Sequence, residues 1–391
     1  MKAVTWQSAR KVATETVPDP SILKPTDVII RVTSTAICGS DLHLLDTFVP
    51  FMNRGDILGH EPMGVVVEVG GDVRNLRAGD RVVIPFVIAC GECAMCQRGL
   101  TTQCETTQNR ASGTGASLYG YTKLYGAVPG GQAEFLRVPL ADFNARTIGG
   151  EFDDERYLFL SDILPTAWQG VEYANVPDGG TLGVLGLGPV GQLVTRIGRY
   201  RGYRVLAADP VPERRALAER HGAETFDLTD DLLDSLREST DGRGPDSVID
   251  AVGMEAHGNP IAAFAQNAVG ILPDPLGEKV AKKAGIDRLA ALLLAFDAVR
   301  RGGTVSVSGV YAGAVDPLPM MTLFDKGLSV RTGQCNVHRW LDDLLPLVED
   351  PADPLRVTDL VTHRGGLDDA ADLYDAFKTK SDGCIKVVLR P

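Results

Sequence analysis

Four cysteines lie close together in the sequence with the spacing C-x2-C-x2-C-x7-C. They are Cys90, Cys93, Cys96 and Cys104. Four thiolates at this spacing can surround one tetrahedral Zn²⁺ and leave no coordination position open, so such a site is structural. The alternatives are two local disulfides or four unrelated thiols, and a reducing compartment disfavours the disulfides. The spacing therefore predicts a structural zinc ion.

A second set of residues could hold a metal with one position left open. Cys38 opens the run C-G-S-D-L-H, His60 stands in G-H-E, and Asp162 lies in L-S-D-I-L-P. A thiolate, an imidazole and a carboxylate supply the three protein ligands of a catalytic zinc, and the ion is then neutralised by its ligands. A bound alcohol could lose its proton there. From spacing alone, each residue could equally belong to the core or the surface.

A glycine-rich turn of the form G-x-G-x-x-G could bind a dinucleotide. It comprises Gly186, Leu187, Gly188, Pro189, Val190 and Gly191. The turn follows an apolar strand expected at 181–186 and opens a helix expected at 189–201, which is the context that the chemistry requires. The glycines permit the tight turn, the approach of the pyrophosphate and close helix packing, and the helix N-terminus offers N–H groups to the phosphates.

The acidic residue that follows this turn bears on the choice of cofactor. Asp209 ends the next expected strand, 23 residues after Gly186. A carboxylate there can accept both ribose hydroxyls and would repel a 2′-phosphate, so NAD is favoured over NADP. The alternative is an aspartate that only caps a helix. Arg214 could touch the adenosine ribose or phosphate, or could be a solvated helix charge.

The elements that must position these groups change in character near residue 165. Before it, short runs rich in Val and Ile predict strands at 1–7, 27–38, 64–69 and 81–85, which fit a partly open antiparallel β-barrel.

After residue 165, strands alternate with helices, which is typical of a doubly wound parallel sheet. Besides the strand before the glycine-rich turn, we expect strands at 203–208, 247–252 and 304–310. A second helix is expected at 212–221 and a final strand at 384–389, whereas residues 257–287 interrupt the alternation. The fold class is therefore α/β.

The composition excludes some partners. The chain has 391 residues and a formal charge of −12, so we expect neither nucleic acid nor membrane as a partner, and a nucleic-acid zinc ribbon is disfavoured. The first residues lack the apolar region of a secretory signal, and the apolar runs are far shorter than the roughly 18–20 residues of a membrane span. We expect a cytoplasmic protein.

Together these motifs resemble the zinc-dependent medium-chain alcohol dehydrogenase family. The resemblance covers nearly the whole chain. It rests on the run from Cys38 to His43, on G-H-E, on the four-cysteine loop, and on the glycine-rich turn with Asp209. It implies a GroES-like catalytic domain over 1–164, an NAD-binding Rossmann domain over 165–333, and a return to the catalytic domain over 334–391. It also implies a homodimer or homotetramer.

In that family the positions of Cys38 and His60 bind the catalytic zinc, and the third ligand is often a second cysteine. This sequence offers Asp162 instead, and residues 160–166 resemble the branch that includes glutathione-independent formaldehyde dehydrogenase, where an aspartate holds that place. In that branch an inserted loop covers the cofactor adenine, and residues 257–287 resemble that loop.

The resemblance also implies roles for neighbouring residues. The open zinc position binds the substrate oxygen, and Ser40 takes its proton and relays it through the cofactor ribose to His43. Asp41 should orient His60, and Glu61 should help to exchange zinc ligands. Thr166 is expected to touch the nicotinamide. Phe86 is expected to line the substrate pocket, although it could be an ordinary core aromatic.

We therefore expect an NAD-linked oxidoreductase with one catalytic and one structural zinc per chain. Formaldehyde or a small primary alcohol is the expected substrate, and a polyol or amino-alcohol dehydrogenase of the same fold is the alternative. A non-catalytic zinc-binding structural protein is the alternative from another class. Such relatives lack the catalytic ligands, so the presence of Cys38, His60 and Asp162 argues against it.

Overall fold

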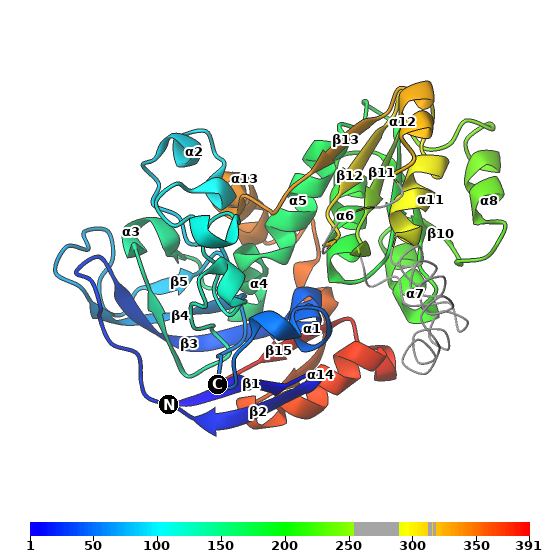
Figure 1. The fold of residues 1–391 in the computed structure, drawn as a ribbon. Helices are drawn as coiled ribbons and strands as arrows, with labels where there is room; N and C mark the ends of the chain where they lie inside the picture. The colour runs from blue at the N-terminus through cyan, green and yellow to red at the C-terminus, as the bar shows by residue number, and fades with distance from the viewer. Residues whose placement is uncertain (254–288, 312–314, 316–317) are drawn as a thin grey trace, which may run out of the picture. The chain divides into compact units, whose positions relative to one another are not determined.

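The computed structural model describes the chain except for residues 254–288, 312–314 and 316–317. The interruption that we expected at 257–287 therefore lies outside the described residues. The described residues form two compact units, drawn in Figure 1. One unit combines Met1–Thr166 with Gln334–Pro391.

The first unit is built on a seven-stranded, mainly antiparallel sheet. Six strands follow the order β14–β15–β3–β4–β5–β7, and β6 also pairs with β3. The bounds are β3 (Val28–Ile37), β4 (Pro62–Val69), β5 (Arg81–Val83), β6 (Phe135–Val138), β7 (Arg146–Thr147), β14 (Val361–Gly365) and β15 (Lys386–Leu389). A separate antiparallel pair joins β1 (Lys2–Ser8) and β2 (Lys11–Thr16). The expected barrel-type catalytic fold is confirmed.

The core of this unit follows the two-residue period of its strands. In β3, Val28, Ile30 and Val32 are buried, and they pack against Val66 of β4 and Leu136 of β6. This period places apolar side chains on one face of the strand, and their packing fixes the positions of the strand ends. The candidate metal ligands lie close to such ends.

Short helices fill the connections of the first unit. They are α1 (Gly39–Asp46), α2 (Ala94–Gln97), α3 (Ala141–Asn144), α4 (Asp154–Leu158), α13 (Val337–Glu349) and α14 (Ala370–Thr379). Helix α5 (Ile163–Ala174) starts in the first unit and continues into the second. None of the helices in the described ranges has the length and apolar character that a membrane span requires.

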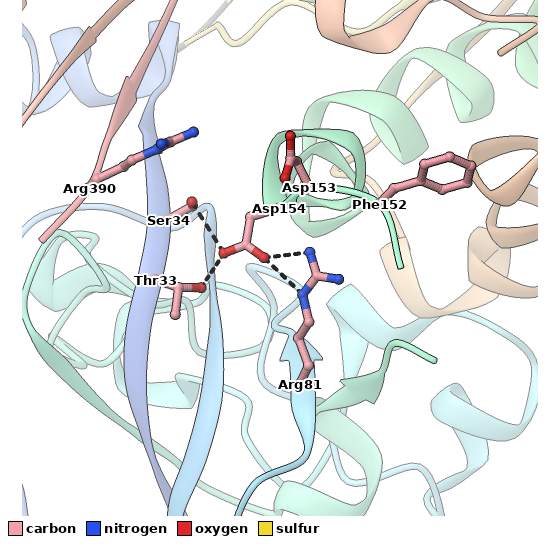
Figure 2. Close-up of a pocket in the computed structure, with 7 residues that line it drawn as sticks. All are labelled: Thr33, Ser34, Arg81, Phe152, Asp153, Asp154 and Arg390. Carbon is pink, nitrogen blue, oxygen red and sulfur yellow. Dashed lines mark hydrogen bonds and ion pairs between the residues drawn. The ribbon is translucent and has the colours of Figure 1, made fainter. Parts of the chain in front are cut away.

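Ion pairs anchor α4 to the sheet, as Figure 2 shows. Asp154 accepts hydrogen bonds from the Thr33 hydroxyl and, at 2.8 Å, from Nε of Arg81. The polar hollow there has a volume of about 370 Å³. Its two guanidinium groups are already paired, Arg81 with Asp154 and Arg390 with Glu155, so these residues serve to fix α4. The fixed helix leads directly to the segment that carries Asp162.

The second unit, Ala167–Gly333, is built on a six-stranded parallel sheet in the order β10–β9–β8–β11–β12–β13. The strands are β8 (Thr181–Leu185), β9 (Arg204–Ala208), β10 (Glu224–Phe226), β11 (Ser247–Asp250), β12 (Thr304–Val307) and β13 (Ser329–Thr332). The helices described with them are α6 (Pro189–Tyr200), α7 (Pro212–Arg220), α8 (Leu232–Glu238), α11 (Ala290–Ala298) and α12 (Met320–Lys326). The strand order reverses between β8 and β11, and open sheets of this type bind ligands at that point. The expected doubly wound sheet is confirmed.

Candidate metal and cofactor sites

The four-cysteine loop brings its thiols together. The Sγ atoms of Cys90 and Cys96 are 4.0 Å apart, and those of Cys93 and Cys104 are also 4.0 Å apart. A tetrahedral zinc with Zn–S bonds of about 2.3 Å separates its sulfur atoms by about 3.8 Å. A disulfide would need about 2.0 Å. The spacing of the thiols therefore fits a closed zinc site and not the two local disulfides.

Backbone amides in the loop stabilise the charged form of the thiols. The amides of Glu92 and Cys93 donate to Sγ of Cys90, and the Cys90 amide donates to Sγ of Cys104 at 3.3 Å. Burial alone would raise the pKa of Cys90, but these amides and the Thr106 hydroxyl lower it. Burial and its neighbouring thiols raise the pKa of Cys96. A bound cation is what would allow all four thiols to ionise together.

The loop docks on the start of α13. Oδ1 of Asn336 accepts hydrogen bonds from the amide of Thr102 at 3.1 Å and from its hydroxyl at 2.9 Å. Near it, the ring of His338 stacks on Phe143 with 4.6 Å between ring centroids. Gly91 faces Phe143, and a Cβ there would lie 2.5 Å from that ring. A metal in this loop would therefore hold one face of the first unit together.

A second buried cluster contains Cys38, His60, Glu61 and Asp162, with one ligand atom of each within 4.8 Å of the others. Oδ2 of Asp162 lies 3.5 Å from Sγ of Cys38 and 3.3 Å from Nε2 of His60. Tetrahedral bonds to zinc of about 2.3 Å for sulfur and about 2.1 Å for nitrogen and oxygen give separations of about 3.6 and 3.4 Å. Three of the four groups are therefore spaced as zinc ligands are.

Each of these residues stands where a regular element begins or ends. Cys38 follows β3 and caps the N-terminus of α1, and His60 lies two residues before the start of β4. Gly59 makes the turn before His60 with a φ of +92°, and Gln132 packs so close that a Cβ on Gly59 would lie 2.3 Å from its side chain. Only glycine therefore fits at this turn, which fixes the direction of His60.

Asp41 holds the imidazole of His60. Its Oδ1 lies 3.1 Å from Nδ1 of His60, while its Oδ2 accepts from the Cys38 amide at 2.9 Å. This contact keeps the proton on Nδ1 and leaves Nε2 free to bind a metal. Burial alone would lower the pKa of His60, but Asp41 and Asp162 raise it well above its usual value. Without a metal, a proton on Nε2 would occupy the place of the cation.

Cys38 also needs a cation beside it in order to ionise. Burial, together with the charges of Asp162 and Glu61, raises the pKa of Cys38 to about 11. The thiolate is the form that binds metal, and a bound metal deprotonates a coordinating thiol. The chemistry of this donor set therefore fits a divalent cation.

A lysine that we did not predict neutralises Glu61. Nζ of Lys386 lies 2.8 Å from Oε1 and 2.6 Å from Oε2 of Glu61, and both side chains are fully buried. Nζ also donates to the backbone carbonyl of Ile37 at 3.0 Å. Burial would lower the pKa of Lys386, but Glu61 raises it, so the lysine stays charged. Glu61 and Lys386 are separated by 325 positions in the sequence. No local pattern could therefore have indicated this pair.

The other residues expected at the reaction centre surround His60. Oγ of Ser40 lies 3.1 Å from Nε2 of His60, and His43 follows on the same helix. The ring centroid of Phe86 is 6.2 Å from that of His60, and the ring of Tyr121, which we had not predicted, is 6.4 Å away. Two aromatic rings therefore pack close to the cluster.

Thr166 contacts the cluster of candidate metal ligands directly. Its hydroxyl donates to Oδ1 of Asp162 at 2.9 Å. We expected Thr166 at the nicotinamide, and that contact stays a prediction. The Thr166 oxygen, which donates its proton to Asp162, can still accept a hydrogen bond.

The glycine-rich turn has the shape that a dinucleotide requires. Gly186 has a φ of +86°, and a Cβ on Gly191 would lie 1.8 Å from the Gly186 carbonyl oxygen. Gly188 is open, because Nη1 of Arg214 is the one described atom within 4 Å of a Cβ there. Pro189 and Val190 form the first turn of α6. The open glycine leaves room for a phosphate at the start of the helix.

Asp209 braces this turn. Its two carboxylate oxygens accept hydrogen bonds from the amides of Leu187 at 2.7 Å and Val211 at 2.8 Å. Nη1 of Arg214 lies 3.9 Å from Oδ2, and the Arg214 side chain is only 12% exposed. That burial argues against a solvated helix charge. Each carboxylate oxygen keeps a second lone pair for a ribose hydroxyl.

Comparison with known proteins identifies relatives along the whole chain. Residues 24–144 match the alcohol dehydrogenase GroES-like domain, and residues 189–267 match the zinc-binding dehydrogenase family. An uncharacterized zinc-type alcohol dehydrogenase-like protein, AdhB of Bacillus subtilis, is 40% identical over all of both chains. Glutathione-independent formaldehyde dehydrogenase of Pseudomonas aeruginosa is 35% identical over 96% of this chain and 94% of that one.

A solved structure supports the same relationship. Alcohol dehydrogenase TADH from Thermus sp. ATN1 is 33% identical, with a TM-score of 0.82 over 100% of this chain and 99% of that chain.

Replacement of Lys386 should reveal the role of its ion pair. In Lys386→Met the buried Glu61 carboxylate loses its partner, so the free energy of unfolding should fall by about 3–5 kcal/mol. The double variant Lys386→Met/Glu61→Gln should recover much of that loss, because no charge is left unpaired. Urea denaturation measures both. Lys378→Met, which breaks the more exposed pair with Asp46, is the control and should cost no more than about 1 kcal/mol. A double variant no more stable than Lys386→Met would contradict this account.

Proposed function

This chain belongs to the zinc-dependent medium-chain alcohol dehydrogenase family, and we propose that it transfers a hydride from a small alcohol or hydrated aldehyde to NAD. The family makes it a zinc-type alcohol dehydrogenase-like oxidoreductase. The observation that carries the finer proposal is the buried set of Cys38, His60 and Asp162, whose ligand atoms have the separations of a three-ligand zinc site. Three protein ligands leave one position for a substrate oxygen.

Residues of the first unit would carry out the proton chemistry. Cys38, His60 and Asp162 would hold a zinc ion, which as a Lewis acid would make the substrate hydroxyl more acidic. Ser40, beside Nε2 of His60, would accept the hydroxyl proton. His43, three residues further along α1, would release it to solvent, since histidine exchanges protons near neutral pH. The rings of Phe86 and Tyr121 would keep water away from the reacting carbon.

Formaldehyde in its hydrated form is the proposed substrate. An aspartate in place of a second cysteine supports this choice, as does the 35% identity to a formaldehyde dehydrogenase. The aromatic rings close to His60 also favour a small substrate over a long polyol. The alternative is a polyol or amino-alcohol dehydrogenase, and the test below distinguishes it from a formaldehyde dehydrogenase.

A substrate panel tests the proposal. The purified enzyme with NAD should oxidise formaldehyde with a kcat/KM at least tenfold above those for sorbitol and threonine, because the aromatic rings close to His60 favour a small substrate. NADH absorbance measures each rate. Turnover of sorbitol or threonine in preference to formaldehyde would select the alternative, and no turnover of any alcohol or aldehyde would refute the proposed function.

We propose NAD as the cofactor because of the charge of Asp209. Asp209→Asn keeps the size of the side chain and removes the charge that would repel a 2′-phosphate, and it gives up one of the two hydrogen bonds that Asp209 accepts from backbone amides. The ratio of kcat/KM for NAD to that for NADP should fall by roughly tenfold or more, which corresponds to about 1.4 kcal/mol. Glu213→Gln, an exposed change in the helix α7 that follows Asp209, should leave the ratio unaltered. Equal efficiency with both cofactors in the unmodified enzyme would overturn this choice.

We propose two zinc ions per chain, with Asp162 rather than Glu61 as the third ligand of the catalytic one. Asp162→Ala should then hold one zinc, lose activity and keep the structural ion. Glu61→Ala should hold two and lose mainly rate, because the Glu61 carboxylate is already paired with Lys386. Elemental analysis of washed protein gives the counts. A single zinc in the unmodified protein, or two in Asp162→Ala, would refute the assignment.

We also propose a homodimer or homotetramer in the cytoplasm. In the described part of the second unit, β13 lies at the edge of the sheet and pairs with β12 alone, and all four of its residues are exposed. Phe324 in the preceding helix α12 is 85% exposed. An exposed sheet edge of this kind, with an exposed aromatic ring close by in the sequence, suits pairing with a second copy. The cytoplasm suits a loop of four metal-binding thiols, since thiols stay reduced there.

A further inference from the structure

The two carboxylates of the catalytic cluster have different partners. Both oxygens of Glu61 lie within 2.8 Å of Nζ of Lys386. Asp162 has no such ion pair with Lys386: its Oδ1 is bonded to the Thr166 hydroxyl, and its Oδ2 faces Cys38 and His60. One oxygen is therefore engaged away from the cluster and the other is directed into it.

Thr166 is joined to Asp162 twice. It lies four residues further along, in the first turn of α5, and its amide donates to the Asp162 carbonyl oxygen at 2.9 Å. Its hydroxyl donates to Oδ1 at the same distance. Residues four apart on a helix face each other, so the helix itself sets the place of the hydroxyl. The position of Oδ1 thus follows from the backbone of α5.

A helix-capping role does not account for this geometry. An aspartate that caps a helix accepts from the amides of the second or third residue inside it. Here the third residue is Pro165, which has no N–H group. The carboxylate of Asp162 thus lacks one usual capping donor, and the Thr166 hydroxyl occupies Oδ1 instead.

We infer that Thr166 is a positioning residue that makes Asp162 bind the catalytic zinc through one oxygen. The hydroxyl retains Oδ1, so Oδ2 alone faces the metal and a position stays open for substrate. The inference rests on the proposed function only for the presence of a metal at this cluster. It assigns a role to a residue outside the ligand set.

Replacement of the hydroxyl in the cobalt-loaded enzyme tests this inference. The catalytic zinc is exchanged for Co²⁺ in the full chain, and affinity is measured by chelator competition. Thr166→Val removes the hydroxyl at constant shape and should weaken Co²⁺ binding by about 10–100-fold, as the loss of such supporting bonds does. The visible d–d absorption should also weaken, because the freed Oδ1 can join the metal and raise its coordination number.

Two further variants control the experiment. Thr166→Ser keeps the hydroxyl and should retain the affinity and the spectrum. Thr240→Val removes a buried hydroxyl of the second unit and should change neither. Retention of the structural zinc, measured by elemental analysis, shows that each variant is folded.

Two results would overturn the inference. One is an unchanged Co²⁺ affinity and spectrum in folded Thr166→Val. The other is a Thr166→Ser variant that behaves like Thr166→Val, since packing and not the hydroxyl would then be responsible. Neither readout requires substrate or NAD. An enzyme that binds Co²⁺ as expected but oxidises no alcohol or aldehyde would therefore refute the proposed function and leave this inference standing.

Discussion

Ionisable groups buried together around Cys38 impose the constraint on which the first unit depends. Buried charge is costly unless it is paired or binds a metal. Asp41 is paired with His60, and Glu61 with Lys386, while Cys38 stays protonated unless a cation lies beside it. The elements of the unit supply these partners: Gly59 turns His60 toward Asp41, β15 brings in Lys386, and the anchored α4 leads to Asp162.

The sequence predicted well those features whose partners lie near one another along the chain. The four cysteine thiols, expected together from their spacing, lie together in the structure. The strand, turn and helix around Gly186 also form where the pattern indicated, because one turn and one strand–helix contact determine them. Strand ends differ by a few residues, as at β12, which ends at Val307, whereas we expected residues 304–310.

What the sequence left undetermined depends on contacts between distant segments. Lys386 stands in a short apolar strand, where a lysine reads as a solvated charge, and its partner Glu61 is far away in the sequence. The hydrogen bonds from Thr102 to Asn336 join segments on either side of the second unit. We did not predict β13 either, because its four residues are all exposed and show no buried apolar period.

The division of the first unit into two segments determines which parts of the chain can fold while it is being synthesised. The ribosome completes Met1–Thr166 and then the whole second unit before Gln334–Pro391 emerges. Until then β3 lacks its neighbour β15, the cysteine loop lacks Asn336, and Glu61 lacks Lys386. Contacts between such distant segments close late in folding. The second unit can fold during synthesis, whereas a chain released early would expose an unfinished sheet edge and an uncompensated carboxylate to chaperones and proteases.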